Sequence, residues 1–319
     1  LVNGEVWWSN GEASGRIGAD DAIRPWGVPS PAGQPLLSAL PYGGLDAGTY
    51  QVAVTFARAD GEESGTGLAA VVDVPQGGGI QLSAIPQGAA DRIRLYASPP
   101  NGEALLLHGE LPMGTTAAVL ARTIRGRRLE TQLTEALPAG QIVRHYNARM
   151  WVAADRVLYA SLPFRYGLYR PHQDYFLFPA RITVLEPVAD GLFVVADATY
   201  FLAGAGPEQM ALRTVDDAGG VEGTGARVPA RHVGVEAPGE VAYWLGSRGA
   251  VLGLPGGGLK AVTESRVALP AYAVGATLLR EREGICQLVT SVREPGPASG
   301  FGVTDAVTVE VRRNGVLLT

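Results

Sequence analysis

The short motifs in this sequence that could bind phosphate or activate a serine are incomplete. Residues 253–260, Gly-Leu-Pro-Gly-Gly-Gly-Leu-Lys, partly resemble a phosphate-binding loop. However, the lysine comes one position late and no Ser or Thr follows it. Ser14 and Ser64 each stand in a G-x-x-S-G segment, whereas a nucleophile elbow requires G-x-S-x-G between a strand and a helix. We therefore interpret all three segments as glycine-rich turns.

Metal ligands are equally hard to assemble from neighbours in the chain. The four histidines are His108, His145, His172 and His232. They are too far apart in the sequence for a local metal-binding spacing. The single cysteine, Cys286, can form neither an intrachain disulfide nor a cysteine cluster. From these residues we expect neither a metal site nor a bound cofactor.

A glycosidase would need two carboxylates that only the fold can bring together. The candidates are Asp155, Asp197, Glu264, Glu281 and Glu283. Asp155 and Asp197 occupy equivalent positions in two similar segments, where Asp favours a turn by accepting hydrogen bonds from nearby backbone N–H groups. Charges alternate over residues 280–283, which is typical of a solvated strand face. We predict structural roles for these carboxylates and assign no catalytic residue.

The densest unusual feature is an aromatic stretch, residues 159–178, with seven aromatic side chains in 20 residues. Aromatic and arginine side chains are typical anchors of protein interfaces. The candidate interface residues are Tyr159, Phe164, Arg165, Tyr166, Tyr169, Arg170, Tyr175, Phe176 and Phe178. The alternative is a long loop that packs on its own protein, and in an oligomer both descriptions can hold.

Turn-forming residues are frequent along the whole chain and predict an all-β fold. Glycine (43) and proline (22) make up about a fifth of the 319 residues, against roughly 12% in an average protein. Asn-Gly pairs, a strong hairpin signal, occur at residues 3–4, 10–11, 101–102 and 314–315. No segment keeps a 3.6-residue apolar period for three turns, so we expect very little helix.

A block of short strands over residues 44–135 predicts a β-sandwich. Residues 49–56 alternate between large apolar side chains and smaller or polar ones, which indicates a half-buried strand. Further short strands, separated by polar turns, follow as far as residue 120. This pattern is typical of a fibronectin type III or immunoglobulin-like sandwich. We predict that the sandwich is inserted near the N-terminus.

Three segments of the remaining chain are similar to one another. Residues 151–159, Trp-Val-Ala-Ala-Asp-Arg-Val-Leu-Tyr, align with 193–201, Phe-Val-Val-Ala-Asp-Ala-Thr-Tyr-Phe, and more loosely with 243–251. Each predicts a strand, a tight turn and a strand, and a spacing of about 40 to 50 residues is typical of β-propeller blades. The alternative is a chance likeness in a chain rich in valine and alanine. The predicted segments are N-terminal strands that complete the propeller, the sandwich, the blades and a C-terminal extension, over residues 1–43, 44–135, 136–292 and 293–319.

The charge balance argues against nucleic-acid binding, and the hydropathy argues against a membrane span. The formal net charge is −5, and the basic residues, all arginines except Lys260, form no basic block. The most apolar stretches, 192–196 and 200–206, are far shorter than the ~18 residues of a membrane helix. The sequence starts at Leu1 without a methionine, and residues 1–11 lack a basic leader followed by an apolar run, so we interpret the start as processed, trimmed or incomplete.

Eight groups of turn and packing residues follow one another in a characteristic order. They are Trp26-Gly27-Val28-Pro29, Thr55-Phe56 with Ala59-Asp60-Gly61-Glu62-Glu63-Ser64-Gly65, Arg94-Leu95-Tyr96, Leu129-Glu130-Thr131-Gln132, Tyr166-Gly167-Leu168-Tyr169, Phe178 with Ile182, Tyr200-Phe201-Leu202-Ala203-Gly204, and Gly223-Thr224-Gly225. In this order the chain resembles tail virion proteins of short-tailed (podovirus-like) phages and related prophages. The resemblance covers about residues 4–292, and residues from Arg293 onward fall outside it.

The resemblance implies a structural tail component of the nozzle or head-closure (stabilisation protein) type, built on a β-propeller. It implies a ring of copies, commonly a hexamer, bound to the portal, its adaptor and other tail proteins. Genomic DNA would pass through the lumen without specific binding, and a mildly acidic chain suits such a conduit. The protein would be assembled in the bacterial cytoplasm and reside in the virion, without membrane insertion, cofactor or enzymatic activity.

A glycan-binding or glycan-cleaving propeller is the alternative from a different functional class. Trp7, Trp8 and the aromatic stretch motivate it, because sugars stack on exposed aromatic rings. Rings that bind a portal complex would favour the tail component, whereas a monomer that binds polysaccharide would favour this alternative.

Overall fold

The computed structural model describes residues 2–122, 125–263, 274–282, 285–293, 307–312 and 315–318. Within these ranges the protein consists of 28 β-strands and two short 3-10 helices, η1 (Ala230–His232) and η2 (Pro255–Gly257). The predicted all-β fold, with very little helix, is therefore confirmed. Neither helix in this part of the chain has the length or the apolar character needed to cross a membrane.

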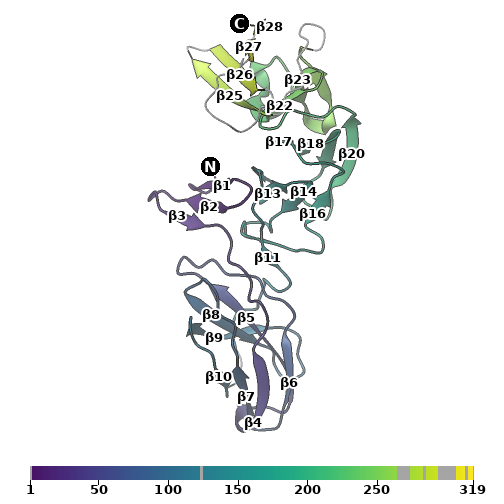
Figure 1. Ribbon diagram of the computed structural model, residues 1–319. Coiled ribbons are helices and arrows are strands. Elements are labelled where there is room, and N and C mark those ends of the chain that lie inside the picture. The colour runs from purple at the N-terminus through teal and green to yellow at the C-terminus, as the bar shows by residue number, and fades with distance from the viewer. Residues whose placement is uncertain are drawn as a thin grey trace.

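Seven strands form two sheets that enclose one hydrophobic core. They are β4 (Leu36–Leu45), β5 (Gly48–Ala57), β6 (Ala70–Val74), β7 (Gly78–Ser83), β8 (Arg92–Ala97), β9 (Leu106–Pro112) and β10 (Ala118–Leu120). One sheet has the order β10-β7-β4 and the other β6-β5-β8-β9, and side chains of both fill the core between them. This sandwich is the lower part of the molecule in Figure 1. Because β4 begins at Leu36, the sandwich includes the end of the segment 1–43.

Strand β5 is more deeply buried than its alternating sequence predicts. Its large apolar side chains, from Tyr50 to Phe56, lie in the sandwich core with at most 3% of their surface exposed. On the opposite face Ala53 is buried as well, because it packs in a second cluster with Leu129 from the segment after the sandwich. A chain segment that is remote in sequence therefore covers the face that was expected to be solvated.

Five antiparallel sheets make up most of the remaining structure. Their strands are β1 (Val6–Ser9), β2 (Ser14–Ile17), β3 (Ile23–Pro25), β12 (Ile142–Tyr146), β13 (Arg149–Ala154), β14 (Val157–Ala160), β16 (Tyr175–Leu177), β17 (Val184–Val188), β18 (Gly191–Val195), β19 (Thr199–Ala203), β20 (Ala211–Asp216), β21 (Ala226–Pro229), β22 (Glu240–Gly246), β23 (Gly249–Gly253), β24 (Leu259–Ala261), β25 (Val274–Arg282), β26 (Ile285–Arg293), β27 (Val307–Arg312) and β28 (Gly315–Leu318). The orders are β1-β2-β3, β12-β13-β14-β16, β17-β18-β19-β20, β21-β22-β23-β24 and β25-β26-β27-β28. A small extra sheet pairs β11 (Glu135–Ala136) with β15 (Leu168–Tyr169).

The first strands of successive sheets are neighbours in space. Strand β12 lies beside both β1 and β17, and β21 lies beside both β17 and β25. Figure 1 shows the sheets following one another from the level of β1–β3 toward β25–β28, at the end of the molecule away from the sandwich. The sandwich enters the chain between the first and the second of these sheets.

The three similar sequence segments lie at equivalent places in three consecutive sheets. Residues 151–159, 193–201 and 243–251 each cover residues of the second strand, the tight turn after it and residues of the third strand. The second strands β13, β18 and β22 are almost entirely buried. Because a sheet packs against each of their faces, these strands are continuous apolar runs rather than alternating ones.

Aromatic side chains fill the spaces between consecutive sheets. Trp151 packs in a cluster shared by the second and third sheets. Phe193 of the third sheet lies 5.4 Å from Trp244 of the fourth, measured between ring centroids. The Tyr243 hydroxyl is 2.9 Å from the Thr290 hydroxyl oxygen on β26 of the fifth sheet. These large side chains fix the distance between neighbouring sheets.

Candidate functional site

The five sheets border one pocket of about 520 Å³. Its lining takes one or more residues from the first strand of every sheet: Trp7 from β1, Arg144 from β12, Glu186 from β17, Arg227 from β21 and Thr277 from β25. Side chains from the first strands therefore converge on a common centre, although consecutive first strands begin more than 40 residues apart in the sequence.

A buried ion pair crosses this centre between Arg144 and Glu186. The Glu186 carboxylate, whose side chain is 1% exposed, accepts hydrogen bonds from Arg144 Nε at 3.0 Å and from Arg144 Nη2 at 2.5 Å. Burial by itself lowers the pKa of Arg144, but the hydrogen bonds and charge of Glu186 outweigh it and raise that pKa. A side chain at Gly225 would meet Glu186 Oε1 at 2.6 Å, so the glycine leaves room for the carboxylate. Both charges are used in holding β12 beside β17.

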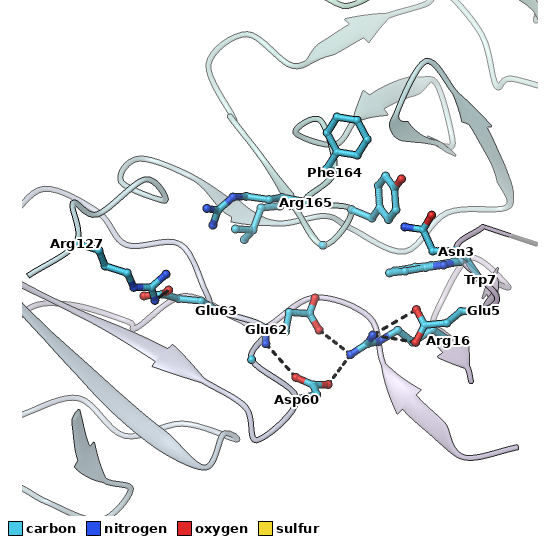
Figure 2. A pocket seen from close by; sticks show the side chains of 14 residues that line it. Asn3, Glu5, Trp7, Arg16, Asp60, Glu62, Glu63, Arg127, Phe164 and Arg165 are labelled. Carbon is cyan, nitrogen blue, oxygen red and sulfur yellow. Dashed lines mark hydrogen bonds and ion pairs between the residues drawn. The ribbon is translucent and has the colours of Figure 1, made fainter. Parts of the chain in front are cut away.

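A second pocket, of about 440 Å³, lies where the first sheet, the sandwich and the aromatic stretch meet. Figure 2 shows Phe164 and Arg165 on one side and Glu62, Asp60 and Arg16 on the other. We call this the junction pocket. Its lining also includes Asn3, Glu5, Trp7, Glu63, Arg127 and Tyr166. Three aromatic rings and seven charged side chains therefore face the same space.

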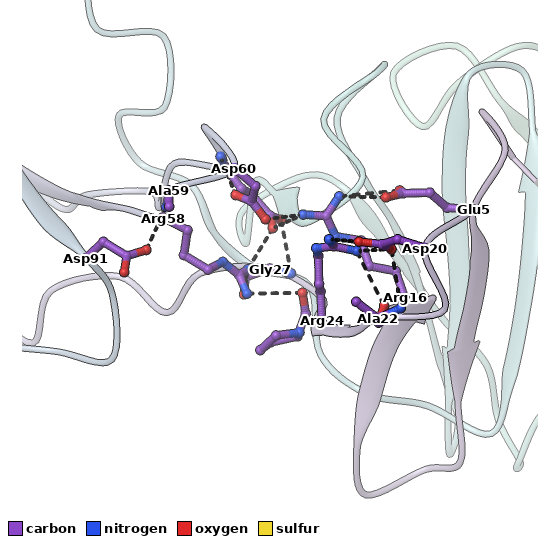
Figure 3. A network of polar contacts seen from close by, with 12 residues as sticks. Glu5, Arg16, Asp20, Ala22, Arg24, Gly27, Arg58, Ala59, Asp60 and Asp91 are labelled. Carbon is purple, nitrogen blue, oxygen red and sulfur yellow. Dashed lines mark hydrogen bonds and ion pairs between the residues drawn. The ribbon is translucent and has the colours of Figure 1, made fainter. Parts of the chain in front are cut away.

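Arg16 of β2 joins the first sheet to the sandwich. Its guanidinium donates to Glu5 Oε1 at 3.1 Å, binds the Asp60 carboxylate, and lies 3.6 Å from Glu62 Oε2. The same guanidinium stands 5.8 Å from the centroid of the Trp7 ring, within the range of a cation–π contact. Figure 3 shows this network. The predicted polar turn at residues 60–65 thus holds two parts of the molecule together.

Glu62 extends this network to the linker before the sandwich. Its carboxylate accepts from Arg58 Nη2 at 2.6 Å and from the Gly27 backbone N–H at 3.1 Å, while Arg58 also donates to the Gly27 carbonyl at 2.5 Å. Burial raises the pKa of Glu62, although the charges of Arg58 and Arg16 act in the opposite direction. Both backbone polar groups of Gly27, in the linker before the sandwich, are therefore hydrogen-bonded to the sandwich.

Glu63 faces away from this network and is the most fully bonded carboxylate of the junction. It accepts hydrogen bonds from Thr55 Oγ1, Tyr96 Oη, Arg94 Nη1 and Arg127 Nη2, all between 2.6 and 2.8 Å. Burial raises the pKa of Glu63, but these bonds and the charge of Arg94 outweigh burial and bring the pKa below its ordinary value. Burial and the neighbouring Glu63 raise the pKa of Tyr96. Glu63 is thus held as a buried anion by several donors.

The aromatic stretch contributes largely to the packing of its own chain. Tyr166 and Phe178 are buried, and Tyr166 stands edge-on to Trp7 at 5.4 Å. Tyr159 and Tyr169 are half-buried and pack edge to face at 5.3 Å. Phe176 is half-buried and stacks on Trp151, with 6.4 Å between ring centroids. The aromatic side chains of the stretch that remain at the surface are Phe164, 77% exposed, and Tyr175, 44% exposed.

The two arginines of the candidate interface are engaged in ion pairs. Arg165 binds Glu130, and Arg170 binds Asp174 at 2.8 Å and also Glu208. The hydrogen bonds and charges of Asp174 and Glu208 raise the pKa of Arg170 above its ordinary value. The interface role of the stretch stays a prediction, and it now depends on the exposed Phe164 and Tyr175.

The other chemistry-bearing residues occupy turns or strands of different sheets. The segment 253–260 passes through η2, and Gly256 and Gly257 there have φ of 82° and 81°, which confirms a glycine-rich turn. Asp155 and Asp197 lie in equivalent turns, as predicted. Glu281 lies on β25. The candidates Glu264 and Glu283 lie outside the described residues.

The histidines lie in separate elements: His108 on β9, His145 on β12, His172 in the turn after β15 and His232 in η1. His145 is next to Arg144 on β12, and its ring lies 5.6 Å edge-on from the Tyr166 ring. Burial, together with the charge of Arg227, lowers the pKa of His145. Within the ranges that the structure describes, no three His, Cys, Asp or Glu side chains are grouped so that they could hold a metal ion.

Sequence reasoning missed the junction pocket, although it singled out several of its parts. Trp7 and the turn 60–65 carry separate signals in the sequence, whereas nothing in the sequence marks Arg16. The nearest signal was three acidic residues within four positions, Asp60, Glu62 and Glu63, in a turn of an inserted module. The chain matches no protein-family model, and no curated protein is detectably similar to it in sequence.

Proposed function

We propose that this protein is a structural component of a phage short tail, of the nozzle or head-to-tail closure type. In this proposal the five sheets are blades of a β-propeller, and the sandwich is an inserted module of the fibronectin type III or immunoglobulin-like kind. Copies of the chain form a ring on the portal and adaptor. Genomic DNA passes through the ring without specific binding.

The observation that carries the proposal is the convergence of five sheets on one centre, with the sandwich inserted between the first two. The convergence agrees with the β-propeller that the resemblance implies, because the first strands line the axis of a propeller. The position of the sandwich agrees with the insertion that the strand pattern predicts. The junction supports a structural role as well. Its charged side chains bind one another, so they fix the sandwich to the sheets.

The charge of the chain supports a conduit that does not retain DNA, because its formal net charge is −5 and arginines that could attract phosphates are paired with carboxylates. Arg144 is paired with the buried Glu186, and Arg227 with Glu240 at 3.2 Å. Paired cations leave little positive potential to bind phosphates, and DNA affinity rests largely on unneutralised Lys and Arg. We expect the protein to pass through a DNA-cellulose column at about 0.1 M salt, where exposed charges interact over roughly 10 Å.

The test is assembly with portal and adaptor rings taken from a short-tailed phage or prophage whose genome encodes this chain. Negative-stain micrographs should show rings of this protein on the adaptor, and the three proteins should sediment together. A protein that stays monomeric and sediments separately from the portal complex would refute the proposal.

The exposed part of the aromatic stretch offers a matched pair of variants. Tyr175→Ser removes a 44% exposed ring, so it should leave the melting temperature unchanged and weaken incorporation into the ring. Phe178→Ser removes a 2% exposed ring and should lower the melting temperature strongly, because it opens a cavity in the core. Normal incorporation of Tyr175→Ser would mean that this side chain does not contact a neighbour.

A further inference from the structure

Phe164 is an exposed aromatic residue in an unfavourable backbone conformation. The Arg165 N–H donates to the Leu162 carbonyl at 3.3 Å across a four-residue turn, and Pro163 and Phe164 are its central residues. Phe164 has φ of 57°, in the left-handed region that favours Gly or Asn at the third position of such a turn. The conformation costs roughly 1 kcal/mol or more for a residue with a large side chain.

Packing within the chain does not compensate for this cost. Phe164 is 77% exposed, the highest exposure among the large apolar side chains of the described residues. Its backbone N–H donates to the Ala148 carbonyl at 2.9 Å, so the backbone of the turn is tied to the β12–β13 hairpin. Strained residues at rigid, exposed positions are characteristic of binding sites. The ring lies at the junction pocket, together with Trp7 and Tyr166.

The lining of the junction pocket also includes hydrogen-bonding groups that are only partly used. Both Glu5 carboxylate oxygens take their hydrogen bonds from one Arg16 nitrogen, although each carboxylate oxygen can accept about two. The Asn3 side chain makes no hydrogen bond with the described residues. The Trp7 Nε1 donor is buried and has no partner in this part of the chain, which is uncommon for a buried polar atom.

We propose that the junction pocket binds a neutral saccharide. The apolar face of a pyranose ring would lie against Phe164, and its hydroxyl groups would donate to Glu5 and Asp60 and bond to the Asn3 amide. Aromatic rings with an adjacent set of polar side chains suit this ligand, because a sugar ring has one apolar face and a rim of hydroxyls. The site goes beyond the structural role proposed above and does not depend on it.

The shape of the site favours a saccharide over a protein partner. Small ligands bind in concave pockets of roughly 300 to 1,000 Å³, often between domains, and the junction pocket of about 440 Å³ lies between the sandwich and the first sheets. A stable protein interface requires about 800 Å² from each partner. The carboxylates outnumber the arginines that line the pocket, which favours hydroxyl donors over an anionic sugar.

The test is saturation-transfer difference NMR with four neutral probes: maltotriose, cellotriose, mannotriose and galactotriose. At least one should receive saturation from the wild-type protein, and Phe164→Gly should weaken its binding at least tenfold. Because glycine is favoured at this φ, Phe164→Gly should melt at the wild-type temperature or slightly above it. Tyr175→Ser, which removes an exposed ring outside the pocket, should bind as the wild type does.

Three results would overturn the proposal. The first is no saturation transfer to any of the four probes at millimolar concentration, and the second is undiminished binding by Phe164→Gly. The third is loss of ring assembly in Phe164→Gly without any saccharide binding by the wild type, which would assign the ring of Phe164 to a protein contact. A failure of ring assembly in the wild type would leave the saccharide result unchanged, so the two proposals fail separately.

Discussion

Replacing Arg144 by leucine would leave a buried carboxylate without its cation at the centre of the five sheets. Glu186 is 1% exposed and takes two hydrogen bonds from Arg144. Breaking a buried ion pair costs about 3–5 kcal/mol, since one charge stays in a poorly solvated place. Arg144 is 29% exposed and borders a pocket of about 520 Å³ that water can enter. We therefore expect Arg144→Leu to lower the free energy of unfolding by about 2–4 kcal/mol.

The double variant separates the charge from the packing. Arg144→Leu with Glu186→Leu removes both charges and keeps apolar side chains at both positions, so its stability should be close to that of the wild type. The assay is urea unfolding followed by tryptophan fluorescence, analysed as a double-mutant cycle. Arg227→Leu is the control: it breaks an ion pair whose side chains are 47% and 46% exposed, and the loss should be below about 1 kcal/mol.

Two results would refute this reasoning. The first is a loss in Arg144→Leu as small as that in Arg227→Leu, which would mean that water solvates the Glu186 carboxylate despite its burial. The second is a double variant in which the two losses simply add. Additive losses would show that the two side chains stabilise the protein independently and not as a pair.

Three further predictions concern the junction and the spaces between sheets. Because the pKa of Glu63 is lowered from its ordinary 4.5, its stabilisation is present above that pH and is lost as the pH falls through the folded-state pKa. Glu63→Gln should therefore be less stable than the wild type at pH 7 and should lose less stability than the wild type between pH 7 and pH 3. An equal fall in melting temperature over this pH range in both proteins would contradict this. Gly65→Ala should lower the free energy of unfolding by about 1–3 kcal/mol, because a Cβ there would overlap the Thr134 carbonyl. The control is Gly67→Ala, which should melt as the wild type does because the space around Gly67 is open. Trp244→Ala should cost about 3–5 kcal/mol in urea unfolding, since the ring is 1% exposed between two sheets, and a loss below 1 kcal/mol would mean that the sheets do not depend on it.

The sequence alone was sufficient for the features that depend on local pattern. Glycine, proline and Asn-Gly pairs predicted an all-β chain because turn conformations are set by the residues that adopt them. The similarity of residues 151–159 and 193–201 placed two equivalent hairpins, since neighbouring sheets with the same surroundings require the same alternation of strand and turn. The glycine-rich segment 253–260 was correctly interpreted as a turn for the same reason.

Tertiary structure decided which of the noted residues meet and which are buried. Strand β5 alternates like a half-buried strand, yet Leu129, far along the chain, covers Ala53 on its second face. Within the aromatic stretch, Phe164 and Phe178 belong to the same residue type and the same short segment, but one is 77% exposed and the other 2%. Composition could not separate them, because exposure depends on what the neighbouring sheet supplies at each position.

The two candidate sites depend on residue pairs that are remote in sequence. Arg16 and Asp60 are 44 residues apart, and Arg144 and Glu186 are 42 apart. The second spacing equals the offset of the repeats at 151 and 193. The alignment of the repeats therefore already pairs the equivalent strands that carry Arg144 and Glu186. The alignment did not predict the ion pair between these two residues. A charge on one strand is stabilised only when the fold brings its counter-charge within a few ångströms and excludes water around both.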